Sequence, residues 1–233
     1  MILVTGGCSF SDYRARAWPV QLTEILTCDP IYTGMSSQGN GLISRKIIYT
    51  LSELLKTTDP SELLVGIMWS GPDRHDFYTT EDTGLNTNID NWLENPTSVI
   101  PDSPNNWVIL NHNWKNRFAK DYYSTFYDNI GASVYTYEHI LRVQWFLKLH
   151  NIKYFMTTYT GEVFANSDHV DTKHLHDQID ADHFLPVTGE YEWCRDYSGI
   201  AYPDPYDKHP SEEQHKRFTE QVIIPFLQSK RYI

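Results

Sequence analysis

Two short segments at opposite ends of the 233-residue chain carry side chains that can together perform nucleophilic catalysis. Ser9 follows an apolar run at residues 2–5 and lies among small residues, so its hydroxyl is expected at the carboxyl end of a strand. His209 stands just before an expected helix, and Asp207 lies two residues upstream of it. An imidazole that a carboxylate orients is a suitable general base for a serine hydroxyl. These residue types therefore predict attack by Ser9 with His209 as the base.

Two alternatives concern the first segment alone. Ser9 or Ser11 can simply cap a helix that begins near Arg14, and by itself the segment favours neither interpretation. A thiol beside a turn, with a distant histidine, is also a known nucleophile, which makes Cys8 a second candidate. Adjacent residues after a strand point in different directions, so Cys8 and Ser9 are not expected to share the site.

Four segments resemble, in order and spacing, the sequence blocks of the SGNH (GDSL-like) hydrolase family. Residues 7–11 (GCSFS) resemble the GCSFT variant of the first block, and residues 207–215 resemble its closing D-x-H-P-S-x-x-x-H block. Residues 37–45 resemble the second block, and residues 69–74 resemble the third block of divergent, often phage-encoded members. The resemblance thus extends across the whole chain.

The resemblance implies a flavodoxin-like three-layer α/β/α sandwich with a mainly parallel sheet. It also implies a serine esterase that needs no cofactor and acts on a small-molecule or carbohydrate ester. Ser9 would be the nucleophile, His209 its base, and Asp207 the acid that fixes the imidazole tautomer. Because the common family spacing between acid and histidine is wider, Asp204 stays open as an alternative acid.

The family also implies an oxyanion hole built from two or three hydrogen-bond donors. The amides of Ser9 and Gly39 are the first two expected donors, although Gly34 and Ser37 lie in the same second-block turn as Gly39. Where the family usually has an asparagine in its third block, this chain has Ser70. The third donor is therefore expected to be the Ser70 hydroxyl, or to be missing.

The spacing of apolar residues predicts the elements that must position these groups. Strands and helices are expected to alternate, with strands at 2–5, 31–32, 63–69 and 153–158 and helices at 18–26, 42–55, 132–150 and 211–227. Pro225 is expected to end the regular part of the last helix early. Alternation of this kind favours right-handed βαβ crossovers, a single domain over residues 1–233, and a site at the carboxyl ends of the strands.

Two long segments, 75–116 and 161–206, break this alternation, and segments of such length are usually functional. The first directly follows the third strand, so it is expected to cover the active-site cleft and bind the non-reacting part of the substrate, most plausibly a sugar. Its flat side chains for that purpose are those of Trp92, Trp107 and Trp114, although the same tryptophans can instead pin the long segment onto the domain.

Charged residues suggest two further hypotheses. Arg74 either binds an acidic substrate or forms an ion pair with Asp73 or Asp76, and the ion pair is favoured. Histidines and aspartates crowd residues 169–183, where a divalent metal site of a metal-dependent hydrolase is one interpretation. A solvated charged face is the commoner meaning of such a segment, so no metal is predicted.

The composition of the chain limits the classes of molecule that it is expected to bind. Hydrophobic residues make up 40% and aromatic residues 14% of the chain, as in a packed globule. The formal charge of −11 repels phosphate backbones, which argues against nucleic acid. No apolar run is long enough to span a membrane, and the first residues lack the basic head of a secretory signal. Residence in the cytosol is expected, and a phage particle component would look the same.

A different class of function stays open beside the esterase. The chain can be a binding module or a virion structural protein that keeps the hydrolase fold without its activity, because fold alone does not determine chemistry. The missing asparagine of the third block is the observation that favours it.

Overall fold

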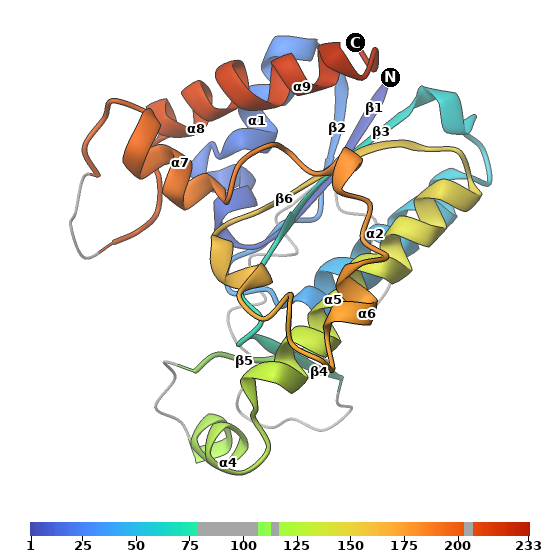
Figure 1. The fold of residues 1–233 in the computed structure, drawn as a ribbon. Helices are drawn as coiled ribbons and strands as arrows, with labels where there is room; N and C mark the ends of the chain where they lie inside the picture. The colour runs from blue at the N-terminus through green and yellow to red at the C-terminus, as the bar shows by residue number, and fades with distance from the viewer. Residues whose placement is uncertain (79–106, 113–116, 203–206) are drawn as a thin grey trace.

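A computed structural model describes residues 1–78, 107–112, 117–202 and 207–233, and its centre is a parallel sheet (Figure 1). Four strands pair in the order β2-β1-β3-β6, and every pairing is parallel. Their bounds are Ile2–Gly6 for β1, Asp29–Tyr32 for β2, Leu63–Trp69 for β3 and Lys153–Thr158 for β6. This order matches the first four strands of a flavodoxin-like sheet, as predicted.

Helices cover both faces of the sheet, which gives the three predicted layers (Figure 1). One face carries α1 (Trp18–Leu26), α7 (Glu190–Tyr197), α8 (Glu212–Phe218) and α9 (Ile224–Ser229). The other carries α2 (Asn40–Leu54) and α5 (Asn129–Leu149), with the short α6 (Lys173–His176) against α5. Within the described residues, no helix has both the length and the apolar character that a bilayer span requires.

Successive residues of the strands supply two separate cores. Leu3 and Leu64 face α1 and the C-terminal helices, whereas their neighbours Val4 and Val65 face α2 and α5. All four side chains are fully buried. Because side chains alternate across a strand, a strand that is covered on both faces must be apolar at consecutive positions. This explains why the central strands have continuous apolar sequences.

The segment after β3 forms structure that the sequence did not predict. Strands β4 (His75–Tyr78) and β5 (Trp107–Leu110) make a separate antiparallel pair, and α4 (Arg117–Thr125) follows them. Strand β4 contacts α2. Trp92 and Trp114, which were expected to bind substrate, lie outside the described residues.

The regular part of the C-terminal helix ends early, as predicted, but it ends before Pro225 and not at it, and the helical segment continues past the proline. A π-helical stretch (Thr219–Ile223) separates α8 from α9, and Pro225 occupies the first turn of α9. A proline costs little there, because the wide turn before it already interrupts the regular hydrogen bonding. Short 3-10 helices complete the chain at Ser9–Ser11 (η1), Tyr13–Ala15 (η2), Pro60–Glu62 (η3), Gly161–Phe164 (η5) and Ala181–His183 (η6).

The packing of β3 against α1 and β6 leads to a stability prediction. A Cβ atom on Gly66 would lie 2.6 Å from the Phe155 ring and 2.9 Å from the Trp18 ring. Gly66→Ala should therefore lower the free energy of unfolding by about 1–3 kcal/mol, measured by chemical denaturation. Gly131→Ala is the matched control, because a Cβ there would approach no closer than 3.9 Å to Asp128 and alanine favours the helix. Equal effects of the two substitutions would contradict close packing at Gly66.

Candidate active site

Ser9 is the first residue of η1 and emerges at the carboxyl end of β1. The sharp turn before it depends on Gly7, where a Cβ would lie 2.3 Å from the Ser11 hydroxyl oxygen and 3.0 Å from the Met68 carbonyl. The Ser11 hydroxyl is buried and accepts a hydrogen bond from Trp18 Nε1 at 3.0 Å. Ser9 is partly exposed, whereas Cys8 is fully buried. Burial of the thiol argues against Cys8 as the nucleophile.

Helix capping does not account for Ser9. The cap of η2 is Asp12, whose carboxylate accepts from the Arg14 amide at 3.0 Å and from Arg14 Nε at 2.9 Å. Neither Ser9 nor Ser11 caps a helix with its side chain. The Ser9 hydroxyl is instead bonded to His209.

His209 is positioned by the start of α8. Ser211 and Gln214 form a capping box, in which the Ser211 hydroxyl accepts from the Gln214 amide at 3.3 Å and Gln214 Oε1 accepts from the Ser211 amide at 2.9 Å. Pro210 between His209 and the cap is buried. The His209 ring packs against Phe10, with ring centroids 5.1 Å apart. These contacts hold the loop of the C-terminal block over the Ser9 turn.

The second histidine of that block has a different environment. His215 is 2% exposed and its Nδ1 lies 2.7 Å from a carboxylate oxygen of Glu190, which is itself fully buried. Burial raises the pKa of Glu190, and His215 opposes that effect. The pair ties α8 to α7 from inside the protein, so His215 anchors the segment that carries His209.

Ser9, His209 and Asp207 form a continuous hydrogen-bonded trio. The Ser9 hydroxyl oxygen lies 2.7 Å from His209 Nε2, and His209 Nδ1 lies 2.5 Å from Asp207 Oδ1. The carboxylate also accepts from the His209 amide at 3.0 Å. These two bonds from His209 lower the pKa of Asp207. With Nδ1 donating to the carboxylate, Nε2 has a free lone pair that accepts the Ser9 proton.

The trio is open to solvent, because the side chains of His209 and Asp207 are 51% and 58% exposed. Asp204, the alternative acid, lies outside the described residues. The structure thus brings the three predicted residues together, and their catalytic roles stay predictions.

Two of the three expected oxyanion donors are engaged elsewhere, which corrects the sequence prediction. The Gly39 amide donates to Asp76 Oδ1 at 3.0 Å. The Ser70 hydroxyl is fully buried and accepts from Arg74 Nη1 at 3.0 Å. The Gly39 amide is thus already used as a donor, and the Ser70 hydroxyl is buried away from solvent, whereas the trio is exposed. Among the described groups, none accepts from the Ser9 amide, so this donor stays available.

Arg74 is held within the fold instead of forming the expected ion pair. Its guanidinium lies 5.5 Å from the centroid of the Tyr159 ring and donates to Ser70. Burial acts to lower the pKa of the Arg74 guanidinium. Neighbouring groups, of which Cys8 has the largest effect, raise it by more, so the pKa lies above the ordinary value for arginine. No carboxylate in the described part of the chain pairs with this guanidinium. The favoured prediction of a pair with Asp73 or Asp76 was therefore wrong.

Asp76 is an important residue of this region that the sequence did not indicate. Its carboxylate accepts from the Gly39 amide at 3.0 Å and from the Leu42 amide at 2.9 Å, at the N-terminus of α2. A Cβ on Gly39 would lie 2.6 Å from Asp76 Oδ2, so the contact requires glycine. Burial raises the pKa of Asp76 to about 6, although both amides and Lys46 oppose the rise. No local motif marks the contact, because strand and helix are distant in sequence.

The histidine- and aspartate-rich segment shows pairs of side chains. His169 lies 3.7 Å from Asp171, and His183 lies 3.1 Å from Asp180. Most of the other acidic and histidine side chains of residues 169–183 are exposed. Among the described residues, no three candidate ligands converge on one point.

Comparisons with known proteins give a family match in sequence and a likeness to a solved structure. The model of a family of unknown function (DUF6071) matches residues 6–229. No curated protein matches the chain in sequence. A solved structure from Desulfitobacterium hafniense DCB-2, assigned to the G-D-S-L family of lipolytic proteins, aligns with a TM-score of 0.48 and 13% identity. The alignment covers 100% of this chain and 99% of that one.

Asp76 generates a prediction about stability and pH. Burial raises the pKa of Asp76 from 3.8 to about 6. Between about pH 4 and pH 6 the carboxyl is therefore protonated in the folded protein and ionised in the unfolded chain. The free energy of unfolding should therefore fall as pH rises through this window, by at most about 1.4 kcal/mol per pH unit from this group. Asp76→Asn removes this component, so the stability of the wild type relative to the variant should decrease from pH 4 to pH 6.

Denaturant titrations at several pH values measure that difference. Asp168→Asn, at an exposed carboxylate, is the control and should leave the difference from wild type nearly constant. A difference between wild type and Asp76→Asn that grows with pH would contradict the buried environment of this carboxyl.

Proposed function

The chain belongs to the DUF6071 family, and we propose that it is a serine hydrolase in which Ser9 attacks an ester carbonyl. The observation that carries the proposal is the hydrogen bond between Ser9 and His209, which are 200 residues apart in sequence. A serine at the end of a central strand, a histidine on its hydroxyl and a carboxylate on the other ring nitrogen form the arrangement of a catalytic triad. The geometry lies within the 2.6–3.2 Å range, approximately, that proton transfer requires.

The proposed reaction has two stages. The Ser9 oxygen bonds to the acyl carbon as its proton passes to His209 Nε2, and the carbonyl π electrons move to oxygen. Collapse of this tetrahedral species breaks the bond to the alcohol, which leaves with the proton from His209. Water then attacks the acyl-enzyme with His209 again as base, and the acid product leaves Ser9 free. Asp207 holds the imidazole in the required tautomer and stabilises its charged form.

Stabilisation of the oxyanion is the part in which the chain departs most from the family pattern. The Ser9 amide is the available donor next to the nucleophile. One such donor contributes roughly 3–4 kcal/mol to lowering the barrier in other hydrolases. Since Gly39 and Ser70 are engaged, the site proposed here has fewer donors than the family implies. We expect modest turnover of activated esters as a result.

An open site suits an ester at the edge of a larger molecule. The exposure of His209 and Asp207 leaves these two side chains accessible to an ester from solvent. A small-molecule or carbohydrate ester, with a short acyl group, is the substrate class we propose. The chemistry needs no cofactor, because the nucleophile and the base are both side chains of this chain.

Substitution of the nucleophile or the base tests this function. Ser9→Ala and His209→Ala should each reduce hydrolysis of p-nitrophenyl acetate by roughly 10³-fold or more, because triad members act as a unit. The variant that carries both substitutions should lose little more esterase activity than either single variant. Initial rates, measured with protein whose circular dichroism matches the wild type, give the comparison.

Matched controls are Ser61→Ala and His174→Ala, both at exposed positions away from the trio. They should keep the wild-type rate. A folded Ser9→Ala protein with near-normal activity would exclude the mechanism. A wild-type protein that hydrolyses neither p-nitrophenyl esters nor acetylated sugars would favour a binding or virion structural module with the same fold.

The acid is tested separately. Asp207→Asn should lower kcat while changing KM little, because an amide no longer selects the tautomer that leaves Nε2 free. The effect should be smaller than that of His209→Ala, since Asp207 is exposed and water can partly replace it. Asp204→Asn is the matched control at the alternative acid. A larger loss for Asp204→Asn than for Asp207→Asn would transfer the role to Asp204.

A further inference from the structure

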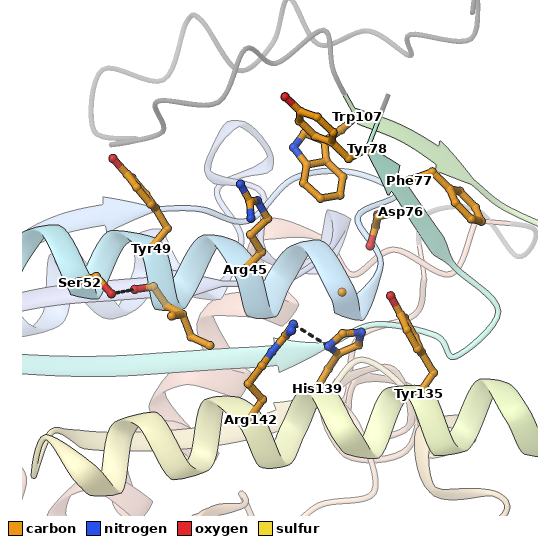
Figure 2. Close-up of a pocket in the computed structure, with 12 residues that line it drawn as sticks. Arg45, Tyr49, Ser52, Asp76, Phe77, Tyr78, Trp107, Tyr135, His139 and Arg142 are labelled. Atoms are coloured by element: carbon orange, nitrogen blue, oxygen red, sulfur yellow. Dashed lines mark hydrogen bonds between the residues drawn. The ribbon is translucent and has the colours of Figure 1, made fainter. Parts of the chain in front are cut away.

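A pocket of about 620 Å³ lies between α2 and α5, with strands β4 and β5 along one side (Figure 2). Its size falls within the usual range for small-molecule sites. Residues Ser9, Asp207 and His209 are not among those that line it. The pocket is therefore distinct from the proposed hydrolytic site, and the inference below does not rest on hydrolysis.

Two arginines from facing helices border this pocket. Arg45 extends from α2 toward Trp107, and Arg142 extends from α5 toward α2, where it is bonded to His139 (Figure 2). The pKa of Arg142 is lowered, mainly by burial and also by the positive charge of Arg45. The two guanidinium groups repel each other, and an anion bound beside them would offset this repulsion.

The bonds that hold Arg142 leave part of its guanidinium unused. Its Nε and Nη2 donate to the Ser44 hydroxyl at 2.9 and 2.7 Å, and Nη2 also donates to His139 Nδ1 at 2.7 Å. Both partners are neutral, so they hold the Arg142 guanidinium in place without neutralising its charge. In the described part of the chain, Nη1 has no hydrogen-bond partner. A fixed guanidinium with free N–H groups suits a carboxylate or phosphate.

His139 provides a second unused donor. The residue is 7% exposed, and burial, together with Arg142 and His75, lowers its pKa to about 3, so the ring is neutral. Because Nδ1 accepts from Arg142, the ring proton lies on Nε2, which is buried and has no partner in the described part of the chain. Nε2 is turned toward Gly41, where a Cβ would lie 3.3 Å from it and 3.2 Å from the Tyr135 hydroxyl.

Flat side chains line the rest of the pocket. The Arg45 guanidinium lies 5.3 Å from the centroid of the Trp107 ring, and the two form one wall (Figure 2). Tyr49 and Tyr78 add further aromatic surface. The carboxylate of Asp76, which also lines the pocket, already accepts hydrogen bonds from two backbone amides at the start of α2. The pocket thus offers aromatic faces for a ring and a positive centre for an anion.

We propose that this pocket binds a small ring compound that carries one oxyanion group, with the oxyanion between Arg45 and Arg142 and the ring against Trp107. Carboxylates and phosphates share the chemistry that the two guanidinium groups recognise. A sugar acid and a nucleoside monophosphate are the two sources of such a ligand. Trp107 thereby contacts the ring of the ligand in this pocket.

Isothermal titration calorimetry with four probes tests the proposal. Glucuronate and uridine monophosphate carry the oxyanion, and glucose and uridine are their neutral counterparts. At least one anionic probe should bind with a Kd below roughly 1 mM, and its neutral counterpart should bind roughly tenfold more weakly or not at all. Comparison of the two anions identifies carboxylate or phosphate as the preferred group. Absence of binding by both anions, or equal binding by the neutral counterparts, would overturn the proposal.

Variants locate the bound anion. Arg45→Gln, at an exposed position, should weaken binding by roughly tenfold, and Arg45→Lys should weaken it less because the charge remains. Arg142→Gln should have at least the effect of Arg45→Gln, since the fixed fork is lost. Arg117→Gln, at an exposed arginine of α4, is the control and should bind as the wild type does.

Ser9→Ala separates this proposal from the hydrolase function. It should bind the anionic probe with wild-type affinity even though it lacks esterase activity. Loss of binding in Ser9→Ala with unchanged binding in Arg45→Gln would assign the probe to the Ser9 site and overturn the inference.

Discussion

Burial of the central strands on both faces is the constraint on which the rest of the structure depends. Strand β1 pairs with β2 on one edge and β3 on the other, so its position is determined by backbone bonds on both sides. Its carboxyl end is therefore a fixed point, and the tight turn at Gly7 delivers Ser9 from it. Gln38 completes this framework by donating to the Gly7 carbonyl at 3.2 Å. The nucleophile candidate is thus rigid although its hydroxyl is accessible.

His209 is held beside Ser9 by interactions of a different kind. An exposed ion pair such as that of His209 and Asp207 contributes little to stability and cannot by itself hold a loop in place. The buried pair of His215 with Glu190 and the capping box of α8 do so from beneath. Structural anchors and candidate catalytic groups are therefore divided within one short segment: the anchors are buried, and the candidate catalytic groups are exposed to solvent.

Asp76 organises the other side of the sheet edge. Its carboxylate satisfies amides at the start of α2 that would otherwise lack partners, and acidic groups are favourable at a helix N-terminus. The same bonds remove the Gly39 amide from the set of oxyanion donors. They also leave Asp76 at the end of the pocket between α2 and α5, where Arg45 and Arg142 supply the positive charge. The bonds of Asp76 thus lie between the Ser9 turn and the pocket that Arg45 and Arg142 line.

Sequence alone was sufficient to predict the four strands of the parallel sheet, the long helices and the layers, because the apolar periodicity of each element reports which of its faces are covered. The blocks around Ser9 and His209 also indicated which residues meet, since parallel strands and the helix after His209 bring their ends to one edge. Only the tertiary structure decided whether a polar group is available. The Gly39 amide is engaged by Asp76, 37 residues away, and Arg142 bonds to Ser44, 98 residues away. Local patterns carry no signal of such contacts, because hydrogen bonds between elements depend on how the elements pack. For the same reason the pocket of Arg45, Arg142 and His139 could be found only in the folded chain.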